Sequence, residues 1–168
     1  MSLLDIPLVS RVRRNHAVEH ATMHVLARRQ PYLNVVGRTA LDGFYVYGNV
    51  DTTALANSAA EGLARLQAGE AELAVHPRCG TNLAVAGFLA GLAAFMVMVV
   101  GRSKSRLSKF PSFILAATLA VIVSQPLGLL IQERVTTLPD VSGLRISGVT
   151  QQGLGRFTMH KVELEEGY

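Results

Sequence analysis

The sequence predicts an α+β protein in which a small two-layer domain carries a pair of transmembrane helices. Two uncharged apolar runs, 83–100 and 113–131, are each long enough to cross a hydrocarbon core of about 30 Å. Before them, helical and strand patterns follow the order helix, strand, strand, helix, strand. After them come two further β-rich segments, which are marginal as an isolated pair and are therefore expected to complete the first domain's sheet. The expected domains are 1–80, 81–132 and 133–168.

The first helix is expected over about residues 10–29, with Pro7 near its start, Ser10 as a candidate N-cap and Pro31 beyond its end. Two β-rich runs, 35–41 and 44–50, flank Asp42-Gly43, a pair typical of a type I′ hairpin turn. Positive φ at both central positions of such a turn is tolerated by Asp and Gly.

Asp51 or Thr52 is expected to cap a second helix over 53–67, which Gly69 follows. Its apolar stripe predicts one buried face. Alternating residues at 71–76 then predict a third strand.

Two features of the apolar runs bear on how the membrane helices pack. Gly87 and Gly91 have the spacing that allows close helix contact, which predicts a tight hairpin with the second helix. The same helices are expected to offer a surface for a homo-oligomer. Gln125 and Pro126 lie within the second run, where the proline predicts a kink and the amide requires a partner, a neighbouring helix being favoured over a substrate.

The composition points to a membrane rather than to nucleic acid. Apolar residues make up 49% of the 168 residues, charged residues 17%, and mean hydropathy is +0.31. The formal net charge of +4 has its origin in the loop between the apolar runs, whose cations have no acidic neighbours: Arg102, Lys104, Arg106 and Lys109. No aromatic residues alternate with basic ones as in single-strand nucleic-acid grooves, so nucleic acid is not an expected partner.

The basic loop, 102–111, is expected to be cytoplasmic, with both flanking domains outside or in the periplasm. Residues 1–81 would then have to cross the membrane, and no cleavable signal peptide is visible. Arg11, Arg13 and Arg14 oppose this orientation, although they lie far from the first span.

Candidate metal ligands lie on one face of the first helix. His16 and His20 are one turn apart, so two imidazoles can reach one ion, and Glu19 lies beside them. His24 continues the stripe and is interpreted as a surface residue or a residue supporting the ligands. A polar helix face with scattered histidines is the alternative interpretation.

A zinc site needs three or four ligands, and the best additional candidates are His76 and Cys79, on either side of Pro77-Arg78. The alternative is that His76 ends a strand and Cys79 is a small residue near the membrane. Glu61 is paired with Arg65 at i,i+4, which favours a solvated face, and His160 is interpreted as a lone histidine in an edge strand. A single cysteine excludes an intrachain disulfide.

The string His16-x-x-Glu19-His20, followed by a hairpin and a helix, resembles the insulinase/pitrilysin metallopeptidases. This resemblance implies that His16 and His20 bind zinc and that Glu19 is the catalytic base. That family's third ligand is a glutamate on a further helix, for which Glu61 is a candidate, but this chain enters its first apolar run at about that point. The resemblance covers about 60 residues and lacks the peptidase's second half-domain.

The whole chain also resembles a small bacterial two-span membrane family of unknown function. Asn15–Thr22 match its Asn-His-Ala-x-Glu-His-Ala-Thr helix, and His76–Thr81 match its His-Pro-x-Cys-Gly-Thr motif. This resemblance implies no activity.

Two functional hypotheses follow. The first is a membrane-anchored zinc-dependent hydrolase, with a peptide or membrane-protein substrate. In it His16 and His20 hold the metal, His76 or Cys79 completes the site, and Glu19 activates water. The second is a non-catalytic membrane module with a structural metal site or a packed histidine cluster. An open coordination position beside Glu19 separates the two hypotheses.

Overall fold

The computed structural model describes residues 3–100, 107–154 and 157–167, and the chain divides into two compact units. Met1–His76 and Glu133–Tyr168 form the first unit, and Pro77–Gln132 form the second. Mixed helices and an antiparallel sheet confirm the α+β class.

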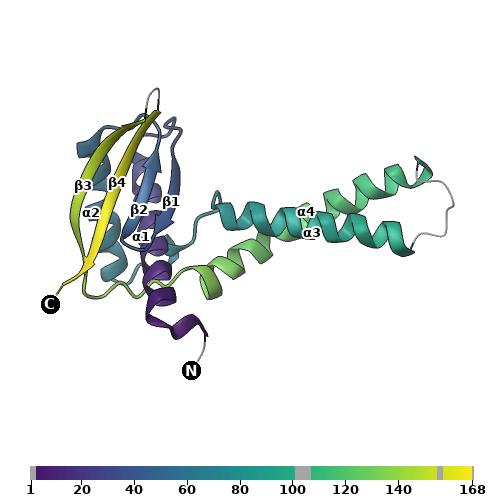
Figure 1. Ribbon diagram of the computed structural model, residues 1–168, viewed down its shortest axis with the longest axis horizontal. Helices are drawn as coiled ribbons and strands as arrows, with labels where there is room; N and C mark the ends of the chain where they lie inside the picture. Colours follow the sequence, from purple (N-terminus) through teal and green to yellow (C-terminus); the bar gives the residue numbers. More distant parts are fainter. Residues whose placement is uncertain (1–2, 101–106, 155–156, 168) are drawn as a thin grey trace. The chain divides into compact units, whose positions relative to one another are not determined.

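The first unit contains two helices, α1 (Pro7–Arg29) and α2 (Thr52–Gln67), on one face of a four-stranded antiparallel sheet (Figure 1). The sheet order is β1-β2-β4-β3, and the bounds are β1 Val36–Ala40, β2 Gly43–Tyr47, β3 Leu144–Leu154 and β4 Phe157–Glu166. Strands that follow the apolar runs therefore pair directly with strands that precede them. The expectation that the C-terminal segments complete the N-terminal sheet is confirmed.

Helix α1 begins three residues earlier than expected. Ile6 is its N-cap and Pro7 its first residue, a position where the missing N–H of proline leaves no hydrogen bond broken. The prediction that Ser10 is the cap is wrong, because Ser10 lies within the helical segment. Its hydroxyl donates to the Leu4 carbonyl at 3.0 Å. Arg28 and Arg29 occupy the last turn, where cations complement the helix dipole.

The first hairpin forms as expected, with its turn displaced by one residue. Ala40 pairs with Gly43, so the turn residues are Leu41 and Asp42, and neither has positive φ. The predicted type I′ turn at Asp42-Gly43 is therefore wrong. Gly43 adopts φ 138° immediately after the turn, where a Cβ would lie 2.0 Å from the Val162 carbonyl oxygen.

Helix α2 begins as the sequence indicates. The Asp51 side chain accepts a hydrogen bond from the Ala54 N–H at 2.8 Å, which satisfies one free donor of the first turn. The third strand expected at 71–76 is not formed. Ala71–Ala74 are a 3-10 helix instead, with Leu73 and Ala74 buried, because this short segment caps the helix pair and does not reach a sheet edge.

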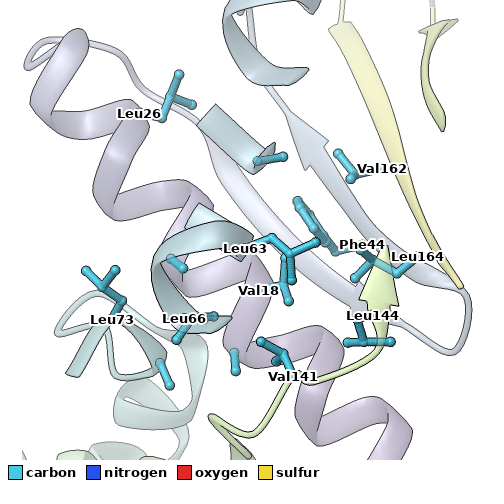
Figure 2. Close-up of a cluster of buried hydrophobic side chains, with 14 of the residues drawn as sticks. Val18, Leu26, Phe44, Leu63, Leu66, Leu73, Val141, Leu144, Val162 and Leu164 are labelled. Carbon is cyan, nitrogen blue, oxygen red and sulfur yellow. The ribbon is translucent and has the colours of Figure 1, made fainter. Parts of the chain in front are cut away.

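The core lies between the helices and the sheet (Figure 2). Val18 from α1 and Leu63 from α2 point toward Phe44 and Val162 on the two central strands. All four are buried. The helices approach each other closely at Gly62, where a Cβ would lie 2.8 Å from the Ala21 backbone carbon.

The second unit consists of α3 (Gly80–Val100) and α4 (Phe110–Ile131), after which Gln132–Thr136 form a π-helical turn. Both helices are long and apolar enough to cross a membrane. Most of their large apolar side chains are exposed, as at Phe88 and Ile114. The basic loop that suggested an orientation lies mostly outside the described residues.

Contact between α3 and α4 occurs away from the predicted glycine pair. The Gln132 amide donates to the Asn82 side-chain oxygen at 2.6 Å, and Gly128 lets that asparagine approach. A Cβ at Gly87 or Gly91 would meet no atom within 4 Å, so their predicted role between these two helices is wrong. The expected hydrogen bond between helices is made by Gln132 rather than by the exposed Gln125.

Candidate metal centre

Two imidazoles lie side by side on α1. The ring centroids of His16 and His20 are 4.2 Å apart. Nδ1 of His16 lies 3.0 Å from the Thr136 carbonyl oxygen, and Nδ1 of His20 lies 2.7 Å from the Ala74 carbonyl oxygen. Because a carbonyl only accepts, each Nδ1 carries a proton and donates it to that carbonyl. Metal-binding histidines are held in the same way by a second hydrogen bond.

The Nε2 atom of His20 is buried and has no hydrogen-bond partner within the described part of the chain. Only 2% of the residue is exposed. A buried acceptor without a partner costs free energy, and buried polar atoms are normally satisfied by protein, water or an ion. A ligand on this atom would remove that cost.

Two further histidines extend the pair. The ring centroid of His76 lies 5.8 Å from that of His20 and 4.7 Å from that of His24. Nε2 of His24 lies 2.9 Å from the Val75 carbonyl oxygen, so Nε2 carries a proton and donates it to that carbonyl. His24, interpreted from the sequence as a surface or supporting residue, thus belongs to a continuous row of four rings.

These spacings suit shared metal ions. With a zinc–nitrogen distance of about 2.0 Å and tetrahedral angles, the centroids of two imidazoles on one ion are about 5 Å apart. The three neighbouring ring pairs, at 4.2, 5.8 and 4.7 Å, bracket that value.

The side chain of Glu19 extends from α1 to the first hairpin. The Thr39 hydroxyl donates to its Oε2, and Gly37 leaves room for its Oε1, since a Cβ there would lie 2.2 Å from that oxygen. Burial raises the pKa of Glu19, while the Thr39 hydrogen bond and the charge of His16 lower it. The carboxyl group is thus held within the electrostatic reach of His16.

Cys79 immediately precedes α3. The Thr81 backbone N–H donates to its Sγ, with a nitrogen–sulfur distance of 3.4 Å, and the Sγ lies 3.5 Å from the Thr81 hydroxyl oxygen. Together, the side chains of His16, His20 and Cys79 could hold a metal ion. A mixed nitrogen and sulfur set is typical of zinc.

The other candidates lie apart from this row. Glu61 forms ion pairs with Arg29 and Arg65, which agrees with the solvated face expected from the sequence. His160 lies in the interior strand β4, fully buried, so its assignment to an edge strand is wrong. Its Nε2 lies 3.0 Å from the Thr52 hydroxyl. Burial lowers the pKa of His160, against a smaller opposite effect of Asp51.

Sequence reasoning missed the groups that orient the rings. The acceptors for His16 and His20 are backbone carbonyls of Thr136 and Ala74, and any residue supplies a carbonyl. Thr39 and Gly37 gave no signal either, because their role depends on how the hairpin packs on α1. Only the predicted hairpin could have placed them near Glu19.

Comparison with known proteins supports the family rather than the peptidase resemblance. Residues 11–149 match the family described as Domain of unknown function (DUF6391). An uncharacterized protein of the cyanobacterium Picosynechococcus sp. is 37% identical over 136 residues, which are 75% of this chain and 65% of that protein. The chain therefore spans slightly less than two thirds of that relative's length. No solved structure matches. The chain belongs to the DUF6391 family.

Proposed function

We propose that this chain is a membrane-anchored, zinc-dependent hydrolase. The observation that carries the proposal is the buried, unpaired Nε2 of His20, next to the His16 ring and with both Nδ1 atoms anchored on carbonyls. His16 and His20 supply two ligands. His76, in ring contact with His20, or Cys79, three residues later in the chain, supplies the third.

Zinc with an open position lowers the pKa of a bound water to about 7. Glu19 is the residue proposed to take up the proton during hydrolysis. It is adjacent to His20 in sequence, interacts electrostatically with His16, and is oriented by Thr39. Gly37 permits the carboxylate to stay close to the hairpin. The proposed substrate is a peptide or a membrane protein.

The membrane location follows from α3 and α4. Exposed apolar side chains cover both helices, and a lipid bilayer removes such surfaces from water. We place them across a bacterial inner or plasma membrane, with the basic 102–111 loop in the cytoplasm.

A second candidate function is a structural metal site in a non-catalytic membrane module. It is favoured by the Glu19–Thr39 hydrogen bond, which occupies one carboxylate oxygen, and by a cysteine among the donors. Such a site closes all four coordination positions with protein ligands, whereas a hydrolase leaves one open.

The test is zinc content of the full chain purified in detergent, measured for the wild type and for His16→Ala/His20→Ala. We expect bound zinc in the wild type and its loss from the double variant, with His160→Gln as a control that keeps it. No zinc in the wild type, after zinc is offered, overturns the metal site.

Hydrolysis is then assayed with a peptide library on the zinc-loaded protein. Glu19→Gln is expected to abolish cleavage while zinc stays bound, and Glu61→Gln to leave cleavage unchanged. Zinc binding without cleavage in the wild type favours the structural module.

A further inference from the structure

We propose that His24 and His76 form a second metal position beside the one at His16 and His20. Nothing in the proposed hydrolase uses His24, yet its ring lies 4.7 Å from that of His76, centroid to centroid, close to the separation of about 5 Å expected for two imidazoles on one ion. The proposal assigns His76 to this outer position and leaves Cys79 as the third ligand of the inner one. It rests on the proposed function for the inner position only.

The tautomer of His24 favours this assignment. Its Nε2–H donates to the Val75 carbonyl, which leaves Nδ1 as the ring nitrogen for an ion, whereas His16 and His20 use Nδ1 for their bonds to carbonyls. The hydrogen bond to Val75 also ties the ring to the residue next to His76. The two imidazoles are therefore brought together by the same short segment, which is the kind of support that metal-binding histidines usually have.

The two positions differ in their ligands. His20 is almost fully buried, whereas His16, Cys79, His24 and His76 are all partly exposed. An ion on His24 and His76 would keep water molecules as its remaining ligands, so it is expected to bind more weakly than one held by two imidazoles and a thiolate. Borderline divalent ions that favour imidazole, such as zinc, nickel or copper, are the expected occupants.

His76 has ring contacts with both His20 and His24, at centroid distances of 5.8 and 4.7 Å. An ion at the outer position is consequently one ligand exchange away from His20.

The experiment is a zinc titration of the full chain in detergent, monitored by calorimetry. Elemental analysis after removal of excess metal is the second measurement. We expect two ions in the wild type, with at least a tenfold difference in affinity. His24→Ala and His76→Ala should each lose only the weaker ion. His16→Ala/His20→Ala should lose the tighter ion, and His160→Gln should keep both.

Cobalt provides a third measurement, since a thiolate ligand adds a sulfur-to-cobalt charge-transfer band. That band should form with the first equivalent, survive in His24→Gln and His76→Gln, and disappear in Cys79→Ser. Circular dichroism of each variant establishes that it is folded, and the glutamine variants test the assignment if an alanine variant unfolds.

Other outcomes separate the two proposals. A single ion in the wild type, kept in His24→Ala but lost in His76→Ala, overturns the second position and places His76 in the one site of the proposed function. A single ion lost in His24→Ala also overturns it. No ion in the wild type overturns both.

Discussion

The close approach of α1 and α2 at Gly62 predicts that even one methyl group there is destabilising. In Gly62→Ala the new Cβ would lie 2.8 Å from the Ala21 backbone carbon and 2.9 Å from the Thr22 nitrogen. Ordinary contacts begin at about 3.4 Å, so α1 must shift by roughly half an ångström. Backbone atoms cannot rotate away as a side chain end can.

Two effects of the substitution oppose each other. Alanine is favoured over glycine in a helix interior by about 1 kcal/mol, whereas overpacking a well-packed core costs about 1–3 kcal/mol. The contact is with backbone, so we expect overpacking to dominate and the free energy of unfolding to fall by up to about 2 kcal/mol. A shift of α1 also moves His20 relative to the Ala74 carbonyl that orients it, so zinc affinity should fall as well.

The assay is urea unfolding of the detergent-purified protein, together with zinc affinity, for the wild type and Gly62→Ala. Gly87→Ala is the matched control, because a Cβ at Gly87 meets no atom within 4 Å, and it should be neutral or slightly stabilising. If Gly62→Ala is as stable as Gly87→Ala, the helices are not packed as closely as the structure indicates.

Three further predictions concern buried polar groups and the helical hairpin. Burial lowers the pKa of His160, so the native state favours its neutral form. The free energy of unfolding should therefore fall as pH decreases below about 6.5, and less so in His160→Gln; equal pH slopes in urea unfolding would contradict this. Thr39→Val removes the hydroxyl that donates to Glu19 and should cost about 1–3 kcal/mol in urea unfolding, whereas Thr39→Ser should cost much less. Equal losses would show that the hydroxyl contributes nothing. Gly128→Ala places a Cβ 2.4 Å from the Asn82 side-chain oxygen and should lower the melting temperature of the protein in detergent. An unchanged melting temperature would refute that contact.

Periodic patterns predicted the elements that bury a continuous face. The 3.6-residue repeat located α1 and α2, and the β-rich runs on both sides of the membrane segments located all four strands. The segment at 71–76 misled, because strict alternation over six residues does not distinguish a strand from a short 3-10 turn that buries two residues. Only its tertiary position, against the helix pair, decides between them.

The candidate site divides along a similar line. Helical spacing placed His16 and His20 on one face, and the short motif around Pro77 singled out His76 and Cys79. The sequence did not show that the His24 ring contacts the His76 ring, since that contact depends on where the chain lies after α2. His160 was misjudged because strand order, and so whether β4 is an edge, comes from pairing between distant segments.

The carbonyls that orient the two imidazoles connect the site to the membrane segments. Ala74, which fixes His20, lies just before the chain leaves the first unit, and Thr136, which fixes His16, lies just after it returns. Each ring is therefore oriented by one of the two connecting segments that join the helical hairpin to the sheet domain. Arg13 strengthens the second connection by donating to the Arg134 and Thr137 carbonyls, both at 3.1 Å. A change that displaces either connection should rotate one imidazole and weaken metal binding, although it touches no ligand. The candidate site would then be complete only in a chain in which both connections are correctly placed.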